Sequence, residues 1–142
     1  MNVKQAGPRG LGVIIGVLIF AAVLTALYWV LFFSGSGAAV TNDPRYLAFE
    51  YAFPAADAWM AIGAVIGAVG LLRHRSWGVL FALLAGSASI YLGLMDVLFD
   101  LENGIYLLGG VNVDVEVVIN VLTLGLGSAL IWYVWSRRSG LL

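Results

Sequence analysis

The fold of this chain is decided by residues 46–73, which read YLAFEYAFPAADAWMAIGAVIGAVGLLR. The stretch places two carboxyl groups, Glu50 and Asp57, in or beside a run that is otherwise apolar. A spacing of seven puts both acids on one face of a helix, and Pro54 between them weakens the backbone hydrogen bonds and predicts a kink. No charged residue follows Asp57 until Arg73, so the second half of the stretch is apolar enough to lie in lipid.

Composition places the whole chain among membrane proteins. Of its 142 residues 62% are hydrophobic and only 11% are charged, which is far from the balance of a soluble domain. A helix needs about 20 apolar residues to span a bilayer, and four runs reach that length. We predict an all-α polytopic membrane protein with a single domain over residues 1–142, whose transmembrane helices span about residues 11–33, 46–72, 77–99 and 115–136.

The basic residues predict how these helices are oriented. If the loops alternate between the two sides of the membrane, six of the seven basic residues share one side: Lys4, Arg9, Arg73, Arg75, Arg137 and Arg138. Lysine and arginine are enriched in cytoplasmic loops. We therefore expect an antiparallel up-down bundle in a prokaryotic inner or plasma membrane, with both termini in the cytoplasm. The first run is longer than the roughly 7–15 apolar residues of a signal peptide and predicts an uncleaved helix.

All eight acidic residues lie on or just within the opposite face of the predicted bundle. An ionised aspartate at the bilayer centre costs at least ~2.5 kcal/mol on insertion scales, so an acid within a span should face protein, water or a ligand. Four polar residues flanked by apolar sequence should meet and line one outward-open cavity: Glu50, Asp57, Asp96 and Asn120. Tyr28 or Tyr91 is expected at its wall. As a pair, Tyr28 and Trp29 could line a site or form part of an interfacial aromatic belt, and we favour the belt.

Such a cavity is suited to a cation, either a divalent metal or an organic amine. Hard divalent cations such as Ca²⁺ take carboxylate, amide and carbonyl oxygens as ligands. Asp96 and Asp100 are four residues apart and share a helix face. For a metal, the expected ligands are Glu50, Asp57, Asp96 and Asp100.

Residues that the sequence lacks exclude several cofactors. Without cysteine, thiolate-ligated iron–sulfur clusters cannot form. The single histidine, His74, lies in a short polar turn, so a haem with two histidine ligands from one chain is excluded. The only lysine, Lys4, precedes the first helix, so a retinal Schiff base inside the bundle is excluded as well. Membrane lipids are expected as partners, and nucleic acid is not.

Three functions are compatible with this pattern. The leading one is a binding protein whose outward-facing acidic pocket takes a cation. The second is an accessory or structural subunit of a larger membrane complex, because two helices carry glycines at a spacing of four that permits close helix contact, Gly12 with Gly16 and Gly63 with Gly67. The same glycines predict a homodimer. The third is an enzyme on a lipid-like substrate, with Asp57 and Asp96 as acid and base; the sequence favours binding over catalysis.

Two local structures are compatible with residues 111–117. Their alternating sequence, VNVDVEV, has the period of a short strand that folds over residues 105–108 as a hairpin. The same residues also fit the first turns of the fourth helix, and we favour a helix that begins near Asp114.

The segment formed by residues 53–73 and 77–106 resembles the small four-helix proteins of bacterial inner membranes that carry no assigned activity. The resemblance is general. It implies a four-span topology and no particular chemistry.

Overall fold

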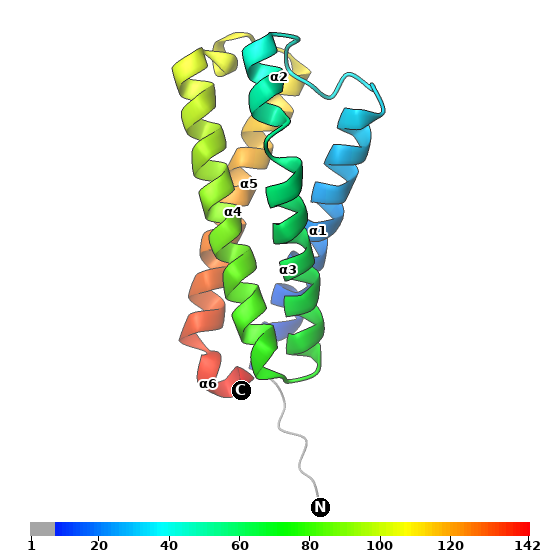
Figure 1. The fold of residues 1–142 in the computed structure, drawn as a ribbon. Coiled ribbons are helices and arrows are strands. Elements are labelled where there is room, and N and C mark those ends of the chain that lie inside the picture. Colours follow the sequence, from blue (N-terminus) through cyan, green and yellow to red (C-terminus); the bar gives the residue numbers. More distant parts are fainter. Residues whose placement is uncertain (1–7) are drawn as a thin grey trace, which may run out of the picture.

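The structure is a computed structural model that describes residues 8–142. Within this range the chain has four helical segments long and apolar enough to cross a membrane. They are α1 (Leu11–Phe33), α2 with α3 (Pro44–Glu50 and Pro54–Leu72), α4 (Ser76–Asn103) and α5 (Val111–Ser136). Figure 1 shows them side by side, and a 3₁₀ turn, η1 (Ile105–Leu107), and a short helix, α6 (Arg138–Leu141), complete the described chain.

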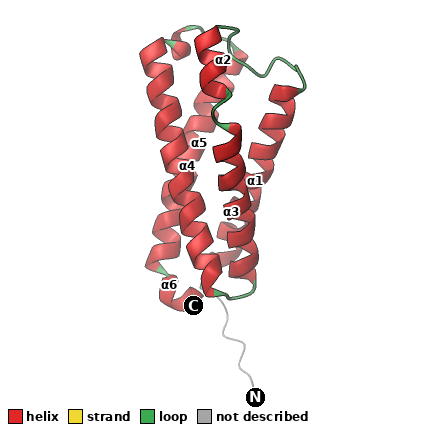
Figure 2. Ribbon diagram, viewed as in Figure 1, coloured by secondary structure: helices red, strands yellow, loops and turns green. Residues whose placement is uncertain are grey.

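The predicted helix boundaries hold for α1 and differ by a few residues elsewhere. The α4 helix extends to Asn103, where Gly104 ends it in the left-handed conformation with φ of 66°. The strand alternative for residues 111–117 is wrong, because α5 begins at Val111 and the described residues contain no strand (Figure 2). The buried positions Val113, Glu116 and Asn120 follow the three-to-four residue spacing of a helix that packs on one face.

Proline chemistry divides the second span into α2 and α3. Asp43 caps α2 by accepting a hydrogen bond of 2.8 Å from the backbone N–H of Arg45, with Pro44 at the first helical position, as predicted. Pro54 has no N–H to continue that helix. The carbonyl of Glu50 instead accepts from the N–H of Phe53 at 3.0 Å, and α3 restarts at Pro54. Glu50 therefore ends one helix, and Asp57 lies in the first turn of the next.

Glycines bring α3 and α4 into close contact. A Cβ on Gly67 would lie 2.8 Å from the backbone nitrogen of Ala82, and Cβ atoms on Gly70 or Gly78 would overlap the backbone of the other. The close-packing face of α3 is therefore used inside the bundle. Gly12 and Gly16 on α1 have no neighbour within 4 Å of an added Cβ, so the homodimer stays a prediction.

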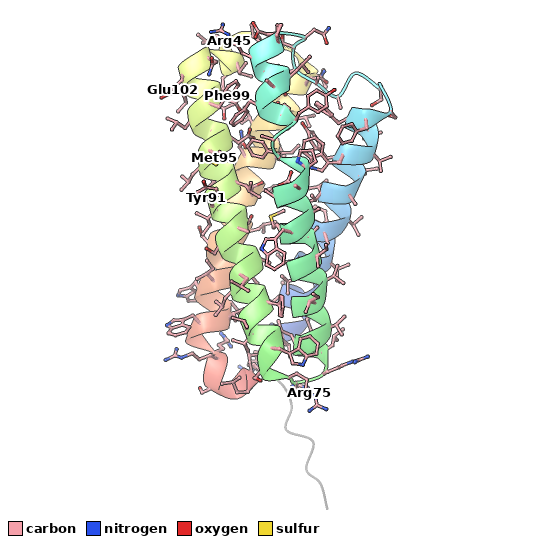
Figure 3. All side chains as sticks on the ribbon, in the orientation of Figure 1. Arg45, Arg75, Tyr91, Met95, Phe99 and Glu102 are labelled. Carbon is pink, nitrogen blue, oxygen red and sulfur yellow. The ribbon has the colours of Figure 1, made fainter. Side chains whose placement is uncertain are left out.

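The two ends of the molecule differ in charge. The start of α1 and the end of α5 lie at the same end (Figure 1), where the Tyr133 hydroxyl donates to the carbonyl of Arg9 at 2.9 Å. Figure 3 shows Arg75 at this end, which we call the basic end, and Arg45 and Glu102 at the opposite, acidic end. Lys4 lies outside the described residues.

An apolar core closes the half of the bundle near the basic end. Its most deeply buried side chains come from all four spans and include Leu18 of α1, Ala68 of α3, Ala82 of α4 and Val134 of α5. The core contains no acid, base or amide side chain. The acidic and amide side chains of the four spans all lie in the half near the acidic end.

Candidate functional site

Three carboxyl groups from three different helices meet in the half near the acidic end. Glu50 ends α2, Asp96 lies on α4 and Glu116 lies on α5, and each offers an oxygen within 4.8 Å of the other two. Glu50 and Glu116 are buried, and Asp96 is half-buried. In the described part of the chain the one ion pair is the exposed contact of 3.7 Å between Arg45 and Asp43. The carboxyl triad Glu50, Asp96 and Glu116 thus has no basic side chain to balance it.

Two tyrosine hydroxyls orient members of this triad. The hydroxyl of Tyr28 on α1 donates to Oε2 of Glu50 at 3.0 Å, and that of Tyr46 on α2 donates to Oε2 of Glu116 at 3.1 Å. The Tyr46 hydroxyl also accepts a hydrogen bond of 3.4 Å from the backbone of Val40. Each phenol engages one oxygen of its glutamate, so the second oxygen of each glutamate is left for another partner.

Asp57 lies beside the triad and has its own partner. Its Oδ2 accepts a hydrogen bond of 2.8 Å from the indole Nε1 of Trp29. Trp29 therefore belongs to the wall of the site and is not simply a residue of an interfacial belt. The contact links α1 to α3 at the level of the acids.

A second polar cluster lies behind the triad, toward η1. The amide Nδ2 of Asn120 donates to Oδ2 of Asp100 at 3.2 Å and to the hydroxyl of Tyr106 at 2.9 Å. Asp100 is fully buried, and its Oδ1 is the one buried side-chain polar atom of residues 8–142 without a hydrogen-bond partner. Burial raises the pKa of Tyr106 to about 12, and the neighbouring Asp100 carboxylate adds to the rise.

The acids open onto one cavity of about 120 Å³. A cavity holds a water molecule once it exceeds roughly 10–15 Å³, so this one has room for more than a bare ion. Its polar wall consists mainly of Tyr28, Trp29, Glu50, Asp57, Asp96, Glu116 and Asn120. Its remaining wall is largely apolar and comes from α1, α3, α4 and α5, with Phe20, Met60, Leu92 and Ile119 among the contributors.

The structure brings together most of the residues that the sequence nominated. Five of them line the cavity: Tyr28, Glu50, Asp57, Asp96 and Asn120. Tyr91 does not, because it lies on the outward face of α4 (Figure 3) and is 65% exposed. Tyr91 comes five positions before Asp96, so the two side chains point about 140° apart around the helix axis.

The predicted metal ligands need a corresponding correction. Only Glu50 and Asp96 of the four belong to the carboxyl triad. Asp57 is engaged by Trp29, and Asp100 is held by Asn120 outside the cavity lining. The third member of the triad is Glu116, which the sequence analysis did not nominate. The sequence indicates Glu116 only through its position four residues before Asn120, on the same helix face. The alternating pattern of residues 111–117, which also fits a strand, made this position hard to recognise.

Comparisons of this chain with protein-family models, with curated proteins and with solved structures found no match.

Proposed function

We propose that this protein is a small integral membrane protein that binds a cation in the cavity near its acidic end. The observation that carries the proposal is the carboxyl triad, whose oxygens lie within 4.8 Å of one another with no basic side chain between them. Two ionised carboxylates at that distance repel each other by roughly 3 kcal/mol at an effective dielectric constant of 20. A cation placed among the three oxygens replaces this repulsion with attraction.

The proposed setting is a prokaryotic inner or plasma membrane, crossed by an up-down bundle with both termini in the cytoplasm. The basic residues that the structure describes at one end, among them Arg9, Arg75 and Arg137, support this orientation because cytoplasmic loops are enriched in arginine and lysine. The cavity then lies in the half of the bundle near the outer side, and the apolar core separates it from the cytoplasm.

Binding accounts for the site better than acid–base catalysis by Asp57 and Asp96. Asp57 instead accepts a hydrogen bond from Trp29, whereas Asp96 joins two glutamates of other helices. A cluster of three acids is suited to holding positive charge.

The proposal is tested by thermal unfolding of the purified protein in lipid nanodiscs with Ca²⁺, Mg²⁺, Zn²⁺ or methylamine. A ligand at a hundredfold excess over its dissociation constant should stabilise the folded protein by about 2.7 kcal/mol. Glu116→Gln should lose that stabilisation because it removes one charge of the triad. Glu102→Gln is the matched control, since Glu102 is exposed at the same end. A wild type that responds to none of these cations would contradict the proposal.

A further inference from the structure

An apolar groove runs along the outside of the bundle between α1 and α5. The α1 helix packs mainly on α3 and makes few contacts with α5. The space between them has a volume of about 410 Å³, and Leu27 and Leu31 of α1 face Val111 and Val118 of α5 across it. Leu27 is 51% exposed and Val118 is 56% exposed. Within the membrane, this groove is open to lipid.

The groove adjoins the acidic cavity. Six residues line both spaces: Phe20, Leu24, Tyr28, Val115, Ile119 and Leu122. Among them, Tyr28 donates its hydroxyl to Glu50 of the carboxyl triad. The apolar groove and the three acids therefore lie on the two sides of one shared set of residues.

Contacts at both ends of α1 place the opening on the side of the bundle. At the acidic end, the amide of Asn112 on α5 donates to the carbonyls of Gly37 and Ala39 in the loop after α1, at 2.8 and 3.0 Å. At the basic end, Tyr133 and Arg137 of α5 both donate to the carbonyl of Arg9. The helices are thus tied at their ends and separated between them.

The chemistry of the two adjoining spaces specifies one kind of occupant. The inner space offers negative charge, and the groove offers aliphatic side chains with Asp114 as its one acid. A bare divalent ion would leave the groove and most of the cavity of about 120 Å³ unoccupied. A molecule with an ammonium head and an alkyl tail uses both, because its head meets the carboxylates while its tail stays in an apolar environment.

From this arrangement we infer that the cation is an amphiphilic amine, which enters sideways from the lipid between α1 and α5 and leaves its alkyl tail in the groove. The inference rests on the proposed cation-binding function and adds the class of ligand and its route.

The test compares dodecylamine, methylamine and the uncharged dodecanol in binding assays on the protein in nanodiscs of zwitterionic lipid. Val118→Trp narrows the groove and should weaken dodecylamine binding by at least about tenfold, while methylamine, which has no tail, keeps its affinity within about twofold. Leu27→Trp narrows the groove from the α1 side and should act in the same way. Matched controls are Val121→Trp and Val23→Trp, because these residues are 65% and 61% exposed and lie outside the groove. Dodecanol should not bind saturably.

Other outcomes separate this inference from the function on which it rests. If amines bind but neither groove variant changes dodecylamine affinity, the tail lies elsewhere and the inference is overturned while cation binding stands. If only divalent metals bind, the ligand class is wrong and cation binding again stands. If dodecanol binds as tightly as dodecylamine, the groove holds apolar chains without the acids, which also overturns the inference. If no cation binds at all, the proposed function itself fails.

Discussion

The indole Nε1 of Trp29 donates a hydrogen bond of 2.8 Å to Oδ2 of Asp57. The bond joins α1 to α3 at the level of the acids, where α1 has few contacts with α5. It therefore holds one wall of the cavity in place and supplies a donor to a carboxyl group in one of the helical segments that are apolar enough to cross a membrane.

We expect Trp29→Phe to destabilise the protein by about 1–3 kcal/mol, because the substitution leaves the half-buried Asp57 carboxyl without its donor. The measurement is the free energy of unfolding in mixed micelles. Trp132→Phe is the control, since Trp132 is 69% exposed and should change stability by less than about 0.5 kcal/mol. Equal effects of the two substitutions would show that the bond contributes nothing.

Two substitutions of Asp57, the acceptor of this hydrogen bond, should differ in their effect on protein stability. Asp57→Asn retains an oxygen that can accept from Trp29, so the protein without ligand should stay as stable as the wild type or more so. Asp57→Ala removes the acceptor and leaves the indole N–H unpaired, at a cost of about 1–3 kcal/mol. In a double-mutant cycle, Trp29→Phe with Asp57→Ala should cost less than the sum of the single changes by about 0.5–3 kcal/mol. Additive effects would argue against a direct interaction.

Replacing glycine by alanine should destabilise the protein at one helical position and stabilise it at another. Gly78→Ala places a methyl group against the backbone of Gly70, where no side chain can move aside, and should cost about 1–3 kcal/mol. Gly125→Ala on α5 meets no atom within 4 Å and should stabilise its helix by up to about 1 kcal/mol. Unfolding of both variants under one set of conditions checks the prediction. A neutral Gly78→Ala would mean that α3 and α4 can separate at little cost.

Tyr106 makes the stability of the fold depend on alkaline pH. Its pKa is about 12 in the folded protein against the ordinary value of 10.0, because burial and the Asp100 charge favour the neutral phenol. The stabilising contribution is complete below pH 10.0 and should be lost as the pH rises through about 12. Tyrosinate absorbance, compared with Tyr106→Phe, isolates this titration. Asp100→Asn should lower the pKa of Tyr106, whereas Glu102→Gln, which changes an exposed acid, should leave it unchanged.

The charge difference between the two ends predicts where fused reporters become active. A reporter fused after Leu142 should lie in the cytoplasm. A reporter inserted at Gly109, beyond η1, should lie on the outer side of the membrane. Alkaline phosphatase and green fluorescent protein fusions at both positions measure this. Phosphatase activity from the fusion after Leu142 would contradict the proposed orientation.

Local chemistry made much of the fold predictable from the sequence alone. The uninterrupted apolar run of residues 11–33 has the length of a span, and α1 has those bounds. Asp43 with Pro44 specifies a helix start, and Pro54 specifies a break, because each acts on backbone groups within a few residues of itself. The confinement of acids to one half of the bundle also follows from their positions in the chain.

The composition of the site, in contrast, was decided by tertiary packing. Whether a helical side chain faces a cavity or lipid depends on the rotation of its helix, and close contacts such as that of Gly70 with Gly78 set this rotation for α3 and α4. Packing turned Tyr91 outward and brought Glu116 to within 4.8 Å of Glu50 and Asp96. The groove between α1 and α5 likewise exists only in the assembled bundle, because it is the space left where two helices are tied at their ends and do not pack between them.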